Sequence, residues 1–177
     1  QGWLMENDIN PYEGYPGLLP GVFADQVAQE WRFTRTPYGP LSLQLQHDIV
    51  RLAGFHPYWS AVMMRIPALV GVVLIGVFLP RLARRTGHDA SFAAWFGALN
   101  PLLVVDFVGG AHNDSFMMGL MVFGLWLATT ASWAWIPAAL VIGASAAVKQ
   151  PAVMAAVALP FICLLYTSPS PRDKRQS

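Results

Sequence analysis

The chain has 177 residues, of which 55% are apolar and 12% charged, whereas about 25% of the residues of an ordinary soluble domain are charged. Its 11 Lys and Arg residues nearly balance its 10 Asp and Glu residues, so the composition offers no broad basic surface for nucleic acid and no acidic tail. The apolar residues fall in runs that approach bilayer-spanning length, which argues against a water-soluble fold and predicts a polytopic membrane protein.

Residues 1–40 form a polar segment rich in proline, glycine and aromatic residues, without helical periodicity. This composition predicts a structured loop. The aromatic side chains fit a small core inside the loop as well as they fit a surface that stacks on sugars. Because the chain opens at Gln1 without an initiator methionine or a signal sequence, we expect it to be a fragment that lacks its true N-terminus.

Residues 41–54 mix apolar and polar side chains in a pattern that predicts an amphipathic helix lying on the membrane. Residues 61–80 are apolar apart from Arg65, and as a helix they would cover about 30 Å, the thickness of the hydrocarbon core. Three arginines follow in a short loop at positions 81–85. Because clustered arginines are retained on the cytoplasmic side, we expect this loop inside and the N-terminal loop outside.

Three further spans are predicted, over residues 91–108, 115–130 and 135–162. Asn100-Pro101 interrupts the first of them, where proline removes a backbone donor and kinks the helix. The last is expected to continue outward through Lys149-Gln150-Pro151. The expected fold class is therefore all-α, a polytopic transmembrane helix bundle with a large N-terminal extracytoplasmic loop.

The last residues, 163–177, differ abruptly in composition and resemble translated sequencing adapter. We expect this segment to be non-native, and the alternative is a native, disordered cytoplasmic tail. It contains Cys163, the only cysteine, so the rest of the chain has no cysteine chemistry to consider.

Polar residues gather where the predicted helices meet the outer face. The candidates are Asp106, His112, Asn113, Asp114 and Lys149. By helix rise, Asp106 lies about 4.5 Å below the outer turn. Lys149 lies about 21 Å along the helix that starts near Trp135, in a core of about 30 Å, so its side chain can reach the outer headgroups. Because an ionisable residue inside a span is costly, it marks a functional site by default.

Each candidate also has a structural interpretation. His112, Asn113 and Asp114 could cap the following helix, since Asn and Asp are favoured caps. Asp106 and Lys149 could form an intramembrane ion pair. No zinc-ligand spacing, phosphate-binding glycine loop or Ser/His/Asp order indicates another chemistry, so the sequence indicates no cofactor and leaves only a divalent cation open.

Several short elements, taken in order, carry a resemblance to a known family. They are Gln1-Gly2, Asn10-Pro11-Tyr12, Thr36-Pro37-Tyr38-Gly39-Pro40-Leu41, Asn100-Pro101-Leu102, Gly109-Gly110-Ala111-His112-Asn113-Asp114, and Val148-Lys149 with Pro151-Ala152. They resemble the actinobacterial polyprenol-phosphate-mannose-dependent α-(1→6)-mannosyltransferases, membrane enzymes of the GT-C superfamily. The resemblance covers residues 1–161, and the GGAHND turn is its most specific element.

The resemblance implies a mannosyltransferase of the bacterial cell membrane, with an extracytoplasmic active face and an inverting mechanism. Its implied partners are a polyprenyl-phosphate-mannose donor, a mannan or lipoglycan acceptor and the lipid bilayer, without nucleic acid. Lys149, His112 and Asn113 suit the charge that develops on a phosphate leaving group. The expected substrate-binding residues are His112, Asn113, Asp114, Lys149, Asp106 and Tyr38.

In enzymes of this superfamily the catalytic base is an acid of the first outer loop, and its motif is expected upstream of Gln1. Asp8 occupies a nearby loop position but does not match that motif. The resemblance therefore implies that the fragment is inactive alone. The alternative function is a multi-pass transporter or flippase for a polyprenyl-linked or anionic substrate, which should place its polar groups near the bilayer midplane.

Overall fold

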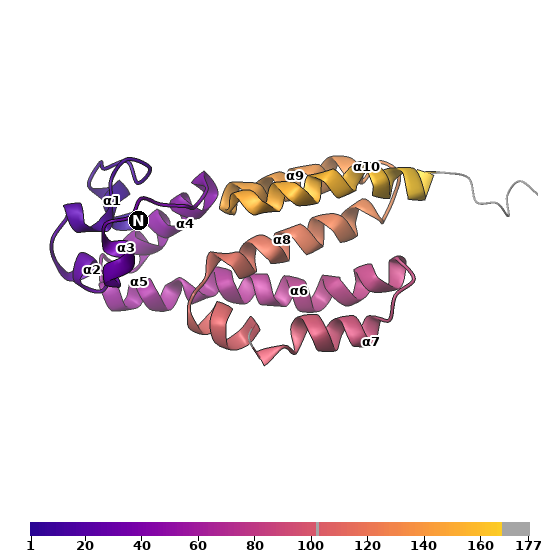
Figure 1. Ribbon diagram of the computed structural model, residues 1–177, viewed down its shortest axis with the longest axis horizontal. Coiled ribbons are helices and arrows are strands. Elements are labelled where there is room, and N and C mark those ends of the chain that lie inside the picture. Colours follow the sequence, from indigo (N-terminus) through magenta and orange to yellow (C-terminus); the bar gives the residue numbers. More distant parts are fainter. Residues whose placement is uncertain (102, 168–177) are drawn as a thin grey trace, which may run out of the picture.

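The computed structural model describes residues 1–101 and 103–167. Within these ranges the chain forms helices and no strand, which confirms the all-α expectation. Figure 1 shows a small N-terminal unit, built from α1 to α4, at one end of a layer of longer helices that run side by side. The predicted tail, 163–177, divides in two: residues 163–167 belong to the last helix, and residues 168–177 lie outside the described residues.

Short helices occupy the segment predicted as a structured loop. They are α1 (Gly2–Glu6), η1 (Pro16–Leu18), α2 (Val22–Asp25) and α3 (Gln29–Arg32). The unit has a small core, because the rings of Trp3 and Phe23 stack with 5.0 Å between their centroids and Leu4 is buried. Trp31 is exposed. The aromatic residues of the loop therefore serve both as a core and as an accessible surface.

The predicted amphipathic helix is present as α4 (Pro40–Leu52). Pro40 suits the first helical position, where the missing N–H would have no helical partner. One face of α4 is buried through Ser42, Leu43, Ile49 and Val50. This face packs against α1 and α9, so α4 connects the N-terminal unit to the helical layer. The position of α4 at a membrane surface stays a prediction.

The first predicted span lies within α5 (Pro57–Met63) and α6 (Arg65–Arg85). With Met64 between them they form a stretch of 29 residues, the one stretch of the described ranges that is long and apolar enough to cross a membrane. The arginines that we expected in the following loop lie on the last turns of α6. Arginine forms helices well and is favourable near a helix C-terminus, which explains why the helix continues to this point.

The second predicted span, 91–108, is broken into separate pieces. They are α7 (Ala90–Ala93) and two π-helical segments, η2 (Ala94–Ala98) and η3 (Leu103–Gly109). All three pack along α6. The break falls at Asn100-Pro101, as the missing donor of the proline predicts, but it is wider than the kink that we expected, because neither neighbouring segment retains α-helical geometry. Leu102 lies outside the described residues.

The fourth predicted span, 135–162, is not one helix but an antiparallel pair. α9 (Trp135–Val148) ends at Lys149, which is extended at φ −156° and ψ 131°, and α10 (Val153–Thr167) begins after the short η4 (Gln150–Ala152). Pro151 cannot donate the hydrogen bond that would continue α9. The returning helix packs through a shared apolar cluster of Ala138, Ile142, Ala155 and Leu159.

α8 (Asn113–Ala128) lies between α6 and α9 (Figure 1). A Cβ atom on Gly71 would overlap the backbone of Ser115, so only glycine permits this approach of α6 to α8. The Ser115 hydroxyl donates to the carbonyl of Ala68 at 3.0 Å, and the Ser145 hydroxyl of α9 donates to the carbonyl of Met117 at 2.6 Å. Small residues and interhelical hydrogen bonds of this kind are typical of helices that pack in membranes.

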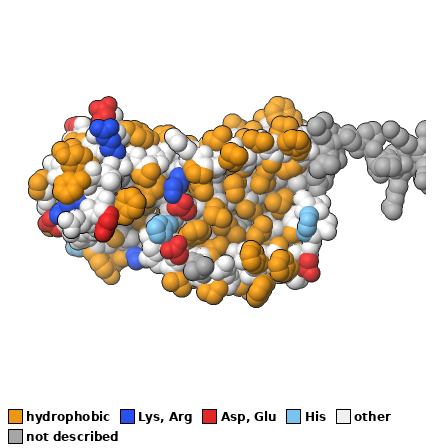
Figure 2. Space-filling model, viewed as in Figure 1, with side chains coloured by type: hydrophobic (Ala, Val, Ile, Leu, Met, Phe, Trp, Pro, Cys, Tyr) orange, Lys and Arg blue, Asp and Glu red, His pale blue; other side chains and the backbone are white. Residues whose placement is uncertain are grey.

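Large apolar side chains cover the outside of the helical layer. Val73, Leu140 and Val157 are 60%, 72% and 59% exposed. Figure 2 shows hydrophobic side chains over most of this layer, while charged side chains concentrate on the N-terminal unit and along its border with the layer. α8, α9 and the last helical stretch, Gln150–Ile162, are apolar but shorter than a full span. Among the residues that the structure describes, one helix is therefore long enough to cross a membrane, and the multi-pass architecture remains a proposal.

Candidate functional site

The centre of the site is an ion pair between α8 and the end of α9. The Lys149 ammonium donates to both carboxylate oxygens of Asp114, at 2.7 and 2.9 Å. The two residues meet because α8 and α9 are antiparallel, so the first turn of one helix lies beside the last turn of the other. The side chains are 29% (Asp114) and 26% (Lys149) exposed, so water reaches the pair. The predicted alternative, a pair between Asp106 and Lys149, is wrong, since Lys149 binds Asp114.

The N-terminal unit reaches this pair through Tyr38 and Gly39. The Gly39 amide donates to the carbonyl of Val148 at 2.9 Å, and a Cβ atom at position 39 would overlap the carbonyl of Ala147. Glycine is therefore required for the contact between the loop and α9. This contact places the Lys149 ammonium 5.8 Å from the centroid of the Tyr38 ring, within the range of a cation–π interaction.

A tight turn carries His112 to the same place. Ala111 adopts the left-handed conformation at φ 52°, and the His112 amide donates to the carbonyl of Phe107 at 2.9 Å. Arg65, at the start of α6, donates to the carbonyl of Gly109 at 3.2 Å and so fixes the turn to the neighbouring helix. His112 Nε2 lies 3.9 Å from Asp106 Oδ1, beyond hydrogen-bonding distance.

These contacts enclose a cavity of about 540 Å³ between the N-terminal unit and the helical layer. Its lining includes Gln1, Trp31, Arg35, Tyr38, His112, Asp114 and Lys149. Four of the six predicted substrate-binding residues therefore face one space. In Figure 2, basic, acidic and histidine side chains meet at this border of the apolar layer.

The other predicted residues lie elsewhere. Asn113 is 8% exposed and starts α8 without lining the cavity. The Asp106 side chain is 62% exposed outside it. Asp8 borders a separate surface depression with Tyr12 and Leu43. In the structure the capping residue of α8 is His112, whose side chain makes no capping hydrogen bond. The structure thus places the cap of α8 in the predicted turn, but without a capping hydrogen bond from the His112 side chain.

Sequence reasoning missed Arg35 in the cavity wall and considered Trp31 only among the aromatic residues of the loop, without assigning it to the site. Both are exposed and precede Tyr38 within one short segment. The sequence signal was their position beside the Thr-Pro-Tyr-Gly-Pro element. The sequence could not show that this loop lies close to Lys149, because contacts between residues more than a hundred positions apart leave no local pattern in the sequence.

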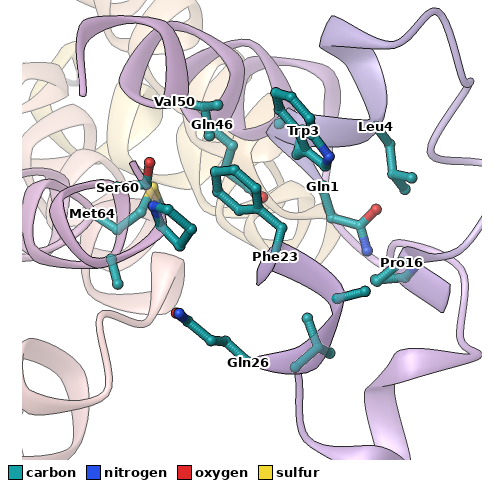
Figure 3. Close-up of a pocket in the computed structure, with 15 residues that line it drawn as sticks. Gln1, Trp3, Leu4, Pro16, Phe23, Gln26, Gln46, Val50, Ser60 and Met64 are labelled. Carbon is teal, nitrogen blue, oxygen red and sulfur yellow. The ribbon is translucent and has the colours of Figure 1, made fainter. Parts of the chain in front are cut away.

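A second, largely apolar cavity of about 350 Å³ adjoins the first, and Figure 3 shows its lining. Gln1, Pro16 and Val27 line both cavities. The side-chain oxygen of Gln1 is buried without a hydrogen-bond partner in the described part of the chain.

The arrangement suits the binding of a small anionic group that is attached to something apolar. The charged cavity offers ammonium, guanidinium and imidazole groups as hydrogen-bond donors, and the carboxylate of Asp114 holds the ammonium in place. The adjoining cavity offers an apolar surface a short distance away.

Comparisons with known proteins give a consistent result. A model of the family described as "Alpha-(1->6)-mannopyranosyltransferase, N-terminal domain" matches residues 1–168. The chain is 32% identical over 162 residues to alpha-(1->6)-mannopyranosyltransferase A of Corynebacterium glutamicum, and this match covers 92% of the chain and 32% of the relative. The enzyme of the same name from Mycobacterium tuberculosis is also 32% identical, over 92% of the chain and 30% of the relative.

A probable alpha-(1->6)-mannopyranosyltransferase of Mycolicibacterium smegmatis is 37% identical, over 83% of the chain and 32% of its own length. The chain thus spans about a third of the length of these curated relatives. No solved structure matches the chain.

Proposed function

The chain belongs to the alpha-(1->6)-mannopyranosyltransferase family, and we propose that it forms the donor-binding part of a membrane mannosyltransferase. In the proposed reaction, mannose moves from a polyprenyl phosphate to a mannan or lipoglycan acceptor on the extracytoplasmic face of a bacterial membrane, with inversion at the sugar carbon. The observation that carries the proposal is the cavity in which Tyr38, His112, Asp114 and Lys149 come together.

The chemistry of the reaction calls for such a cavity. When the bond between the sugar carbon and the phosphate oxygen breaks, the phosphate leaves with an additional negative charge. Cations and hydrogen-bond donors that are already in place stabilise this charge in the transition state. The Lys149 ammonium and the His112 imidazole provide them, and the positive end of the α8 dipole lies at the same level.

We assign Asp114 to binding rather than to proton abstraction. Both oxygens of its carboxylate accept hydrogen bonds from Lys149, so the carboxylate is occupied as the partner of the ammonium. In this role Asp114 holds the ammonium toward the cavity. Asp8 borders a different depression, so it has no place in the proposed donor site.

The proposed topology places the cavity at the outer membrane surface. α6 has 21 residues, which correspond to about 31 Å of helix, close to the thickness of the hydrocarbon core. Its last turns carry the arginines that favour the cytoplasmic side. Arg65 lies at the opposite end, bonded to the turn that bears His112. The exposed apolar surfaces of α9 and α10 would face lipid in a multi-pass arrangement.

Binding of the donor to the whole chain in detergent micelles tests the proposal. The ligand is polyprenyl-phosphate mannose with radiolabelled mannose. We expect saturable binding that unlabelled polyprenyl phosphate displaces and that neutral polyprenol does not. His112→Ala should weaken binding at least about tenfold, equivalent to about 1.4 kcal/mol.

The matched control is His88→Ala, which removes a histidine from the turn at the other end of α6. It should bind the donor as the unmodified chain does. Displacement by polyprenol as effective as that by polyprenyl phosphate would contradict the proposal, because a charged headgroup would then not be recognised. Equal affinities for His112→Ala and the unmodified chain would remove the turn from the site.

A further inference from the structure

Arg35 lies in the wall that the N-terminal unit contributes to the charged cavity. Its side chain is exposed and makes no hydrogen bond or ion pair within the described part of the chain. Arg32, three residues earlier at the end of α3, differs in this respect because it pairs with Asp25. Two arginines of one short segment therefore have different surroundings, and the unpaired one faces the cavity.

The charge of the cavity wall depends on this difference. Its charged side chains are Arg35, Asp114 and Lys149. Because Asp114 holds Lys149 through two short hydrogen bonds, the pair contributes little net charge to the space. The positive charge that remains uncompensated is that of Arg35. An anion that enters the cavity therefore meets Arg35 as the available partner.

The ligand class follows from the geometry of the guanidinium group. Its planar, forked donors match two oxygens of a phosphate, whereas an ammonium acts as a point charge. To bind the same phosphate at full strength, Lys149 would have to give up hydrogen bonds to Asp114. Arg35 loses no such protein partner on binding.

We propose that Arg35 is a phosphate-binding residue of this cavity and makes the ground-state contact with the phosphate of the ligand, while Lys149 stays paired with Asp114. The inference rests on the proposed function, since it concerns the anion that the same site would hold. Under this proposal the N-terminal unit contributes two residues to the site, the aromatic ring of Tyr38 and the charged guanidinium of Arg35.

The experiment compares Arg35→Gln with the matched variant Arg32→Gln, in the whole chain in detergent micelles. The probe is farnesyl phosphate, measured by its heat of binding. We expect Arg35→Gln to weaken binding about tenfold and to reduce its dependence on salt concentration. Arg32→Gln should bind as the unmodified chain does. Arg35→Lys, which keeps the charge but not the fork, should lie between them.

Competition distinguishes a lipid headgroup from a free phosphate. If inorganic phosphate displaces farnesyl phosphate at equal concentration, the site recognises phosphate alone, and if it does not, the site recognises a lipid phosphate. Either result supports the role of Arg35 when Arg35→Gln weakens binding. Equal binding by Arg35→Gln and the unmodified chain would overturn the inference and leave the proposed function standing. Absence of binding by the unmodified chain would overturn both.

Discussion

The two ends of the helical layer are built differently. At the end near the N-terminal unit, side chains from distant parts of the chain meet one another, as in the pair of Asp114 and Lys149. At the other end, most polar contacts are local and run from a side chain to the backbone. Asp89 accepts from the amides of Ser91 and Phe92, and the Thr129 hydroxyl donates to the carbonyl of Trp126.

This difference separates two uses of polar residues. Local side-chain to backbone contacts satisfy helix ends and can form without the rest of the fold. Contacts between distant charged side chains form only when the whole layer is assembled, and they leave donors and acceptors facing a cavity. The long-range end is therefore where the proposed ligand site lies, and the local end is where the helices turn.

The largest expected difference between the ends is their accessibility from outside the cell. On a Cys163→Ser background, we expect Thr34→Cys to react with a membrane-impermeant maleimide in intact cells, because residue 34 lines the charged cavity. His88→Cys, in the turn after the arginines, should react only after the cells are opened. Labelling of both positions in intact cells would contradict the proposed topology.

Loss of the ammonium should have the next largest effect. Lys149→Ala leaves the carboxylate of Asp114 in the cavity wall without its two hydrogen bonds, and the uncompensated negative charge repels a phosphate. We expect the affinity for polyprenyl-phosphate mannose to fall by about tenfold to a hundredfold, measured by equilibrium binding. Arg84→Ala, an exposed cation at the other end, should leave it unchanged. Equal losses in the two variants would mean that only overall charge matters.

The contact between the loop and α9 can be broken without touching a charge. Gly39→Ala places a methyl group against the carbonyl of Ala147, and we expect the free energy of unfolding to fall by about 1–3 kcal/mol, with weaker donor binding. Gly143→Ala, on the same helix α9, meets nothing within 4 Å and should gain up to about 1 kcal/mol from helix propensity. A Gly39→Ala variant as stable as the unmodified chain would show that the loop and α9 are not in close backbone contact.

The smallest expected effect comes from the local end. Asp89→Ala removes the acceptor for the Ser91 and Phe92 amides at the start of α7, and we expect a loss of about 1 kcal/mol in the free energy of unfolding. Thermal unfolding in detergent measures it. Donor binding should not change. A large loss of donor binding would show that α7 contributes to the ligand site, and would contradict the distinction between the two ends.

Sequence reasoning anticipated the parts of the fold that depend on local rules. The helical content follows from long apolar runs, the break at Asn100-Pro101 follows from the missing donor, and α4 follows from its amphipathic pattern. The antiparallel pair of α9 and α10 was missed because an apolar run with one interruption has the same composition whether it continues or folds back. The extended backbone at Lys149 decides between the two.

The site was anticipated only in part for the same reason. His112, Asp114 and Lys149 could be grouped by depth along predicted helices, since helix rise converts sequence separation into height. Their partners could not be derived, because pairing depends on how helices are arranged around one another. Asp106 lies at a similar depth but does not line the cavity, and Arg35 lines it from a loop without periodicity.

The most direct test is photochemical crosslinking with a polyprenyl phosphate that carries a diazirine next to the phosphate. The account predicts adducts within residues 34–38 and 110–114, two of the segments that line the charged cavity, and their loss in the presence of unlabelled polyprenyl phosphate. Adducts confined to the turn at 86–89, or adducts that the competitor does not reduce, would contradict the claim that this end of the layer binds the phosphate.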